Sequence, residues 1–286
     1  MNIHGYLRHI EALNRWDPEN FKTLLFSGRR IGRLKPPMWA ALADWPEVFR
    51  IGADDIRLRE RFDTFEARTR ILAEVTAALV DQEVISHTHG EQYPVTHSGR
   101  ETAIATIDRA AAPYFGLRAY GQHLNGFVRS GEGLKLWIAR RAADRRTFPN
   151  RLDNMVAGGL PYNLSLAENL QKECMEEASV PVSIANRALP VGVLTYCKET
   201  PVGLKPDTIY CYDLELHGDF QPINSDGEVA DFMLLPVMEV ARLVSETDEF
   251  KLNCNLVVID FLVRHGIINP ETPHYSDLVQ GLHENI

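Results

Sequence analysis

Apolar side chains recur with helical spacing in two long stretches of this chain. Residues 65–80 carry phenylalanine, leucine and valine three or four positions apart, and residues 166–180 carry leucine, cysteine and alanine at the same spacing. This spacing predicts amphipathic helices, each with one face packed on a core. A shorter pattern predicts a helix over residues 6–13, and residues 104–112 also fit a helix that ends at Pro113.

Alternating apolar and polar positions predict strands in the second half of the chain. Residues 121–129 and 134–139 alternate on either side of a glycine-containing turn, which is typical of a β-hairpin. Further apolar runs predict the rest of a sheet and helices that cover it. The expected strands are 188–198, 208–216 and 232–236, and the expected helices are 237–244 and 256–265.

The first third of the chain contains few groups of obvious chemistry. Residues 28–35 are basic and glycine-punctuated, and we interpret them as a surface loop in preference to an anion-binding one. Three nearby histidines, His87, His89 and His97, fit loop positions better than a metal site. Residues 91–95 include a proline and predict an edge or connecting strand, because proline cannot donate to a β-ladder.

The helix predicted over residues 166–180 places three carboxylates beside its apolar face. At ~100° per residue, Glu177 falls within the apolar stripe, Glu173 lies at its edge and Glu176 lies just beyond it. Three like charges so close together repel one another, and a hard divalent cation with oxygen ligands would compensate them. A solvated face is the alternative, because glutamate is a good helix former and charge runs commonly mean no more.

Composition and charge narrow the classes of function. The 286 residues are 45% hydrophobic and 24% charged, which is ordinary for a globular protein large enough for two domains. The net charge of -9 gives no overall basic footprint for nucleic acid, and no run is long and apolar enough to span a membrane. The start lacks the apolar core of a signal peptide, and four cysteines without CxxC spacing fit reduced thiols, so we expect a cytoplasmic protein.

The glycine pair and the acidic helix together resemble the Nudix box. Gly159 is followed, after a loop, by Lys-Glu-x-x-Glu-Glu-x-Ser-Val, where the family has Arg-Glu-aliphatic-x-Glu-Glu-x-Gly-aliphatic. The resemblance implies that Glu173, Glu176 and Glu177 bind metal and organise a water. Lys172 stands where the family has arginine, which keeps the charge but loses the bidentate fork.

The match to the box has departures. Ser179 replaces the family glycine near the helix end, and the segment between Gly159 and Glu173 is one residue shorter than usual. The family's first acid has no counterpart in the loop, and Glu168 is the candidate to substitute for it, one turn into the helix. These departures concern the loop geometry more than the metal site.

A longer stretch, residues 123–177, resembles one Nudix group in particular. It contains a His-x-Asn-Gly strand, a Trp-x-Ala-Arg-Arg strand and the run Leu-Asp-Asn-x-Val-Ala-Gly-Gly-x-Pro. The group includes the Nudix half of fungal thiamin pyrophosphokinase fusion proteins and related plant and bacterial enzymes. The resemblance implies an α/β fold, a Nudix α/β/α sandwich with a mixed sheet, preceded by a smaller α+β N-terminal domain. We expect a leader domain at 1–117, a Nudix domain at 118–270 and a polar tail at 271–286.

Several residues of the second half are candidates for the site. Arg140 and Arg141 end a strand, and arginine forks suit phosphate oxygens, although a solvent-facing pair is the alternative. The family often places a further acid on a loop, and Glu228 matches it as metal ligand or base, with a surface acid as the alternative. Gly158 and Gly159 are candidates for close approach of the backbone to a ligand, and Tyr210 is a candidate for stacking on a heterocycle. His123 and Asn125 are candidates for hydrogen bonds to a substrate head group, with a structural role as the alternative for His123.

The combined interpretation is a metal-dependent hydrolase. Magnesium or manganese held by the three glutamates would bind phosphate oxygens and acidify a water for attack at phosphorus. The resemblance implies a thiamin-diphosphate-like substrate, including oxidised or damaged forms, cleaved to the monophosphate and phosphate. A nucleotide-sugar or dinucleotide diphosphatase, an isoprenoid diphosphate isomerase and a non-catalytic diphosphate-binding protein stay open as alternatives. The expected partner is a small-molecule diphosphate, with no nucleic acid and no membrane, and a homodimer is compatible with the sequence.

Overall fold

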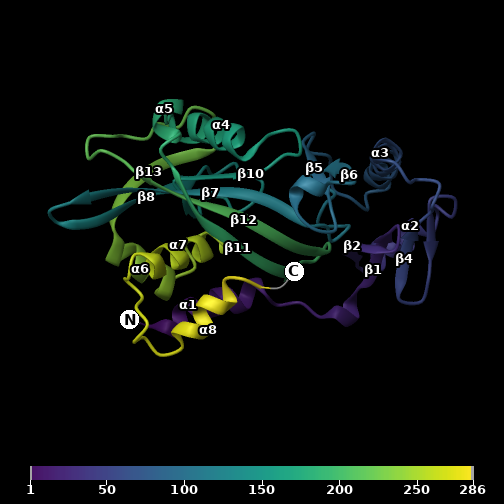
Figure 1. The fold of residues 1–286 in the computed structure, drawn as a ribbon, viewed down its shortest axis with the longest axis horizontal. Coiled ribbons are helices and arrows are strands. Elements are labelled where there is room, and N and C mark those ends of the chain that lie inside the picture. Colours follow the sequence, from purple (N-terminus) through teal and green to yellow (C-terminus); the bar gives the residue numbers. More distant parts are fainter. Residues whose placement is uncertain (1, 285–286) are drawn as a thin grey trace.

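A mixed β-sheet forms the centre of the molecule (Figure 1). Its long strands are β7 (Ala119–Ser130), β8 (Gly133–Arg141), β11 (Leu189–Glu199), β12 (Leu204–Glu215) and β13 (Val229–Pro236). They lie in the order β11-β12-β7-β8-β13, with β7 and β12 parallel and the other neighbouring pairs antiparallel. The short strands β9 (Leu152–Asn154) and β10 (Val156–Gly159) pair with β8 and β7. This computed structural model describes residues 2–284.

Helices cover both faces of the sheet (Figure 1). On one face lie α4 (Leu166–Ala178) and α5 (Val182–Ala185), which share a core with the side chains of that face. On the other face lie α6 (Val237–Glu246) and α7 (Leu252–Arg264), which share a second core with the sheet. The strands alternate side chains between these two cores, and the predicted α/β/α sandwich with a mixed sheet is confirmed.

A smaller α+β module precedes the sheet, as predicted. It contains a four-stranded sheet in the order β2-β1-β4-β3, a two-stranded ladder and two helices around one core. The elements of the module are β1 (Lys22–Phe26), β2 (Arg29–Leu34), α2 (Pro36–Leu42), β3 (Phe49–Ile51), β4 (Asp55–Leu58), α3 (Phe65–Asp81), β5 (Gln92–Val95) and β6 (Ala105–Asp108).

In the part of the chain that the structure describes, no helix is long and apolar enough to cross a membrane.

Two local predictions for this module are wrong. The segment 104–112, predicted as a helix, contains β6, which pairs with β5. Isoleucine and threonine favour a strand there, and ladder pairing outweighs the weak helical spacing. The segment 28–35, predicted as a surface loop, contains β2, which is joined to β1 by a tight turn. The turn residues Ser27 and Gly28 both have positive φ, which matches the twist of a hairpin.

The first and last helices of the chain lie side by side on the sheet (Figure 1). Helix α1 (Ile3–Leu13) packs on α6, α7 and α8 (Tyr275–Gly281), and the Tyr6 hydroxyl donates to the Ala241 carbonyl at 3.0 Å. Leu278 of α8 is fully buried, so the predicted polar tail contains a packed helix. The predicted domain limits stay a prediction, but α1 shares its core with the sheet and not with the module that follows it.

Helix α4 ends at Ser179 in a left-handed conformation, with φ of 51°. A Cβ makes this conformation unfavourable by about 1 kcal/mol, whereas glycine adopts it freely. We expect Ser179→Gly to raise the free energy of unfolding by about 0.5–1 kcal/mol, measured by urea denaturation. Ser179→Ala retains the Cβ and should give no such gain. Equal gains in both variants would assign the effect to the hydroxyl and not to the backbone.

Candidate active site

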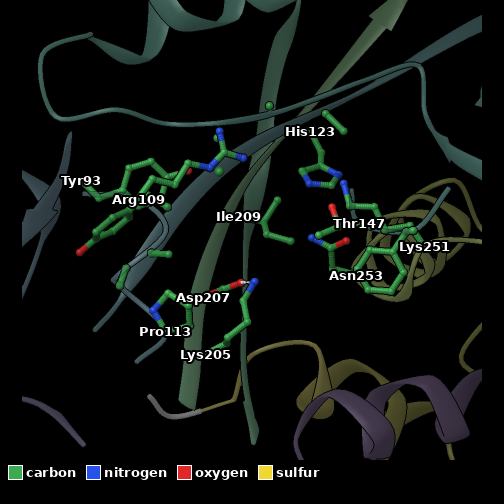
Figure 2. A pocket seen from close by; sticks show the side chains of 18 of the residues that line it. Tyr93, Arg109, Pro113, His123, Thr147, Lys205, Asp207, Ile209, Lys251 and Asn253 are labelled. Carbon is green, nitrogen blue, oxygen red and sulfur yellow. Dashed lines mark ion pairs between the residues drawn. The ribbon is translucent and has the colours of Figure 1, made fainter. Parts of the chain in front are cut away.

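A pocket of about 540 Å³ lies where the sheet, helix α4 and the N-terminal module meet (Figure 2). Glu173, Glu176 and Glu177 of α4 line it, together with the backbone of β10. Tyr93 and Arg109 of the N-terminal module enter it from another side. The candidate acids therefore line a pocket that neither half of the chain forms alone.

Two sets of contacts fix the start of α4. The Ser165 hydroxyl accepts the Glu168 N–H at 3.2 Å, and the Glu168 carboxylate accepts the Ser165 N–H at 2.9 Å, which forms a capping box. Arg100 of the N-terminal module donates to the carbonyls of Pro161, at 2.6 Å, and of Leu164. Glu168 is thus engaged in the helix cap and does not line the pocket in place of the missing family acid.

Glu177 is the most buried of the three glutamates. Its carboxylate accepts the N–H of Ala157 in β10 at 2.8 Å. Burial raises the pKa of Glu177 to about 8, the Ala157 N–H opposes the shift, and the charges of Asp153 and Glu173 add to it. A carboxyl group so unfavourable to ionise would be stabilised by a nearby cation.

Glu173 and Glu176 share one basic neighbour. Lys172 Nζ lies 3.4 Å from Glu173 Oε1 and 2.8 Å from Glu176 Oε2. Burial raises the pKa of Glu173, and the Lys172 charge opposes that shift. Gly158 makes room for Glu173, because a Cβ on Gly158 would lie 2.3 Å from Glu173 Cδ. The glycine is therefore needed for the position of this carboxylate.

The donor set fits a hard divalent cation. All three groups are carboxylates, the ligands that magnesium and manganese prefer, and two of them are unfavourable to ionise in their surroundings. In the described residues the three do not form a group of donor atoms within 4.8 Å of one another. Lys172 is the cation that compensates Glu173 and Glu176 in this structure.

The predicted loop acid also reaches the pocket. Glu228 precedes β13, lines the pocket and pairs with Arg145, whose Nη2 lies 2.7 Å from Glu228 Oε2. The sequence does not single out Arg145, because one basic residue in a basic run gives no sign of its partner. The pair places one cation and one anion near the α4 carboxylates on the pocket wall.

Three other candidates do not line this pocket, and their side chains are engaged elsewhere. Arg140 lies 3.5 Å from Asp231 on the neighbouring strand. Asn125 is buried and donates to the carboxylate of Asp213 at 3.1 Å. The Tyr210 ring stacks on a tyrosine of β7, with ring centres 6.5 Å apart. Their predicted contact with a substrate therefore finds no support in the pocket lining.

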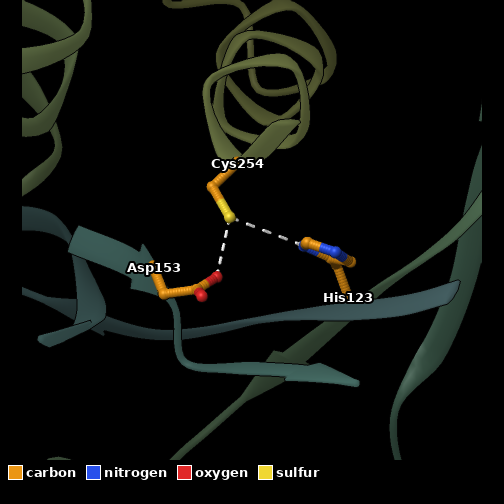
Figure 3. Close-up of side chains that lie close together, drawn as sticks. All are labelled: His123, Asp153 and Cys254. Atoms are coloured by element: carbon orange, nitrogen blue, oxygen red, sulfur yellow. Dashed lines mark hydrogen bonds between the residues drawn. The ribbon is translucent and has the colours of Figure 1, made fainter. Parts of the chain in front are cut away.

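Arg141 and His123 line the pocket but belong to a buried network, of which Figure 3 shows His123, Asp153 and Cys254. Arg141 Nη1 lies 3.0 Å from Asp153 Oδ2, and Lys251 Nζ lies 3.1 Å from the same oxygen. The Cys254 thiol donates to Asp153 Oδ1 at 2.7 Å, and its sulfur lies 3.9 Å from His123 Nδ1. Burial lowers the pKa of His123 to about 4, so the imidazole is neutral at physiological pH.

This network is a charge cluster and not a metal centre. Within the described residues, one group of possible metal ligands has its donor atoms within 4.8 Å of one another. Its members are His123, Asp153 and Cys254. Two cations already neutralise Asp153, and burial raises the pKa of the Cys254 thiol well above its ordinary range. A divalent ion would add a third positive charge beside one carboxylate and would need a thiolate, so these residues do not fit one.

The N-terminal module supplies a wall that the sequence did not reveal. Arg109 Nη1 lies 2.8 Å from Glu91 Oε2, and the Arg109 guanidinium lies 5.6 Å from the centre of the Tyr93 ring. A Cβ on Gly159 would lie 2.1 Å from the Tyr93 hydroxyl and 3.0 Å from Arg109 Cζ. Gly159 thus allows the module to approach β10 closely. This role of the glycine depends on residues far away in the sequence, so no local sequence pattern could predict it.

Two lysines line the pocket on the β11–β12 ribbon. Lys198 and Lys205 are cross-strand partners. Burial lowers the pKa of Lys198, and the charge of Lys205 lowers it further. Lys205 Nζ lies 3.4 Å from Asp207, which also accepts the Tyr196 hydroxyl at 2.6 Å. Like charges opposite each other are unfavourable, so an anionic ligand would stabilise this wall.

Comparison with known proteins places the chain in a family. Residues 123–254 match the model of the NUDIX domain, and residues 5–119 match a domain of unknown function, DUF4743. Nudix hydrolase 24, chloroplastic, of Arabidopsis thaliana is 40% identical over 285 residues, which cover 98% of this chain and 78% of that protein. Nudix hydrolase 20, chloroplastic, of the same plant is 48% identical over 218 residues, which cover 76% of this chain and 58% of that protein. An uncharacterized protein of Saccharomyces cerevisiae is 33% identical over 258 residues, which cover 84% of this chain and 75% of that protein.

The chain therefore belongs to the Nudix hydrolase family. It is an enzyme of the pyrophosphohydrolase class, with an N-terminal DUF4743 module attached to the hydrolase domain. The predicted family and enzyme class are confirmed.

Proposed function

We propose that this enzyme hydrolyses a diphosphate joined to an organic group, with Mg²⁺ or Mn²⁺ held by Glu173, Glu176 and Glu177. The observation that carries the proposal is the convergence of these carboxylates with Gly158 on one pocket. A divalent cation at the carboxylates would supply Lewis-acid stabilisation of phosphoryl charge and acidify an attacking water.

The protein's own side chains have distinct tasks in this proposal. Lys172 and Arg145 bring positive charge beside the carboxylates, where non-bridging phosphate oxygens would lie. Glu228, paired to Arg145, is the loop acid available to accept a proton from water. Asp153 holds Arg141 in place on the pocket wall, and His123, whose pKa burial lowers to about 4, is neutral there.

The size and lining of the pocket support an organic substrate. A volume of about 540 Å³ falls in the range of roughly 300–1,000 Å³ typical of small-molecule sites, more than inorganic diphosphate requires. Tyr93 and Tyr120 offer aromatic surface for a heterocycle. We assign a thiamin-diphosphate-like substrate, including oxidised forms, from the motifs of residues 123–177, and the products would be the monophosphate and phosphate.

Hydrolysis of a panel of diphosphates tests the proposal. The purified enzyme would be incubated with magnesium and thiamin diphosphate, its oxidised analogues, ADP-ribose or NADH, and monophosphate release would be measured. Cleavage of the thiamin-type compounds alone supports the assigned substrate. Cleavage of ADP-ribose or NADH alone keeps the chemistry and rejects the substrate. Absence of cleavage throughout contradicts the proposal for all these compounds.

Metal affinity should depend on pH through Glu177. Its pKa of about 8 leaves the carboxyl mostly protonated at pH 7, and a cation would displace that proton. We expect the apparent affinity for Mg²⁺ to rise between about pH 6 and about pH 8 and to level off above that range. Calorimetric titration at several pH values measures it. Glu177→Gln lacks this titrating group and should show a weaker dependence, because only the raised pKa of Glu173 then contributes. A flat profile for the wild-type enzyme would contradict the assignment.

A further inference from the structure

A second, smaller pocket of about 110 Å³ lies between the N-terminal module and the central sheet. Arg30 and Arg33 of β2, Arg118 just before β7, and His97 line it. Cys197 of β11 belongs to the opposite wall. In the described part of the chain no acidic residue lines this pocket, so its walls are strongly basic.

A β-bulge brings two of these arginines to the same side of β2. Gly32 and Arg30 pair with consecutive residues of β1, so the ladder skips Ile31. Side chains alternate along a regular strand, and residues three positions apart would face opposite sides. The extra residue reverses the alternation, which allows both Arg30 and Arg33 to line the pocket.

The two β2 arginines have no compensating carboxylate. Among the described residues, neither Arg30 nor Arg33 lies within ion-pair distance of an acid. The Arg33 guanidinium lies 5.0 Å from the centre of the Trp16 ring, which leaves its edge free to donate hydrogen bonds. Burial lowers the pKa of Arg33, and the charge of Arg30 lowers it further. An anion between them would relieve this repulsion.

His97 adds an N–H donor that lacks an acceptor. Arg29 Nη1 lies 2.5 Å from His97 Nε2. Arginine can only donate, so Nε2 accepts and the proton of the neutral ring resides on Nδ1. His97 Nδ1 is buried and has no hydrogen-bond partner. Buried donors without partners are rare in folded proteins, and a bound acceptor would satisfy this one.

Backbone contacts make the pocket a fixed feature of the fold. A Cβ on Gly32 would lie 2.2 Å from the Phe115 carbonyl oxygen, and a Cβ on Gly116 would lie 2.1 Å from the Arg33 carbonyl oxygen. The loop before β7 therefore packs directly against β2, with Gly116 at a positive φ of 60°. This contact holds Arg118 and Arg33 on the walls of one cavity.

We propose that this pocket binds a phosphate-type anion, separately from the active site. Its volume is well below the roughly 300 Å³ of the smallest typical organic-ligand sites, which restricts the occupant to a phosphate group. Guanidinium forks and an N–H donor match phosphate oxygens. The two pockets lie on opposite faces of the β11–β12 ribbon, because Cys197 and Pro206 line the small pocket while the adjacent Lys198 and Lys205 line the large one.

Anion titration of the full chain tests this site without using the hydrolytic reaction. The protein would carry Glu176→Gln and be freed of metal, so that neither turnover nor metal-bound phosphate contributes. Inorganic phosphate and phenyl phosphate would each be titrated at constant ionic strength, with binding followed by calorimetry and by the melting temperature. We expect saturable binding, and Arg30→Gln and Arg33→Gln should each weaken it about tenfold or more.

Matched controls separate this site from other basic surfaces. Arg187→Gln changes an exposed arginine outside both pockets, and Lys205→Gln changes the active-site face of the ribbon. Both should leave the affinity of the small pocket for phosphate unchanged. Tighter binding of phenyl phosphate would identify a monoester as the ligand, and equal or tighter binding of inorganic phosphate would identify the free anion.

The proposal is overturned by any of three results. These are no saturable binding, binding that both arginine substitutions leave intact, or binding that Lys205→Gln removes. Arg30 is exposed, so Arg30→Gln should leave the melting temperature of the phosphate-free protein unchanged. The phosphate affinity of this variant therefore tests the proposal even if Arg33→Gln does not fold.

Discussion

Glu176→Gln should lower kcat by about 10³-fold while leaving the fold intact. The substitution removes one of three carboxylate charges from the proposed cation site, and effects of roughly 10²–10⁴ are typical when such a group is lost. The Glu176 side chain is 45% exposed, and its ion pair is with Lys172 on the same helix. The core therefore does not depend on it, and the measured change in kcat reports on chemistry. Steady-state kinetics with saturating magnesium provides the measurement.

A glutamate on another helix provides the control for this variant. Glu246 of α6 also pairs with a basic residue one turn away, Arg242 at 3.2 Å, and it lies outside the pocket. Glu246→Gln should leave kcat within about twofold, because exposed pairs of this kind contribute little. If Glu176→Gln retained more than a tenth of the wild-type kcat, the acid trio would not be the catalytic cation site.

Asp153→Asn should cost about 3–5 kcal/mol of unfolding free energy, far more than an exposed ion pair. Asp153 is 4% exposed and lies within about 3.1 Å of both Arg141 and Lys251. Asparagine keeps the shape but leaves two cations beside a neutral group, and breaking a buried pair from one side is costly. Urea denaturation measures the loss. Glu132→Gln, which breaks an exposed pair with Lys135, should leave the unfolding free energy nearly unchanged.

The pH dependence of this variant gives an independent check. Burial alone would raise the pKa of Asp153, but the charge of Lys251, the hydrogen bond from the Cys254 thiol and the charge of Arg141 hold it below its ordinary value. A lowered pKa means that the stabilisation is present above the unfolded-state pKa, near 4, and is lost as the pH falls further. The wild-type and Asp153→Asn proteins should therefore converge in stability in acid. A constant difference from neutral pH down to acid would show that packing, and not charge, is responsible.

The α4 helix shows how much of the site could be predicted from local pattern. Helical spacing places Glu177 on the buried face and Glu176 outside it, and the structure has both in those environments. Cys174 also lies in the predicted core, where burial raises its pKa to about 12. Periodicity gives the face of a residue because the geometry of a helix is fixed by the backbone alone.

Arg141 shows what local pattern does not contain. From the sequence, an arginine at a strand end is interpreted as a phosphate ligand. In the structure Arg141 pairs with Asp153, which lies on β9 and becomes adjacent only because β9 pairs with β8. The wall formed by Tyr93 and Arg109 has the same origin, since both reach Gly159 through packing between modules. Pairs that meet only in the tertiary fold leave no spacing in the sequence from which they could be predicted.

The position of α1 makes the N-terminal module, in topological terms, an insertion. Helix α1 packs into the core of the hydrolase domain, the following residues form the N-terminal module, and β7 is the next element of the hydrolase domain. A fragment cut at residue 118 would lack α1 and expose the apolar surface of α6, α7 and α8 that this helix covers. Such a fragment should aggregate, whereas removal of the module with α1 retained and joined to β7 would keep that surface covered. The catalytic half of this enzyme is therefore discontinuous in sequence.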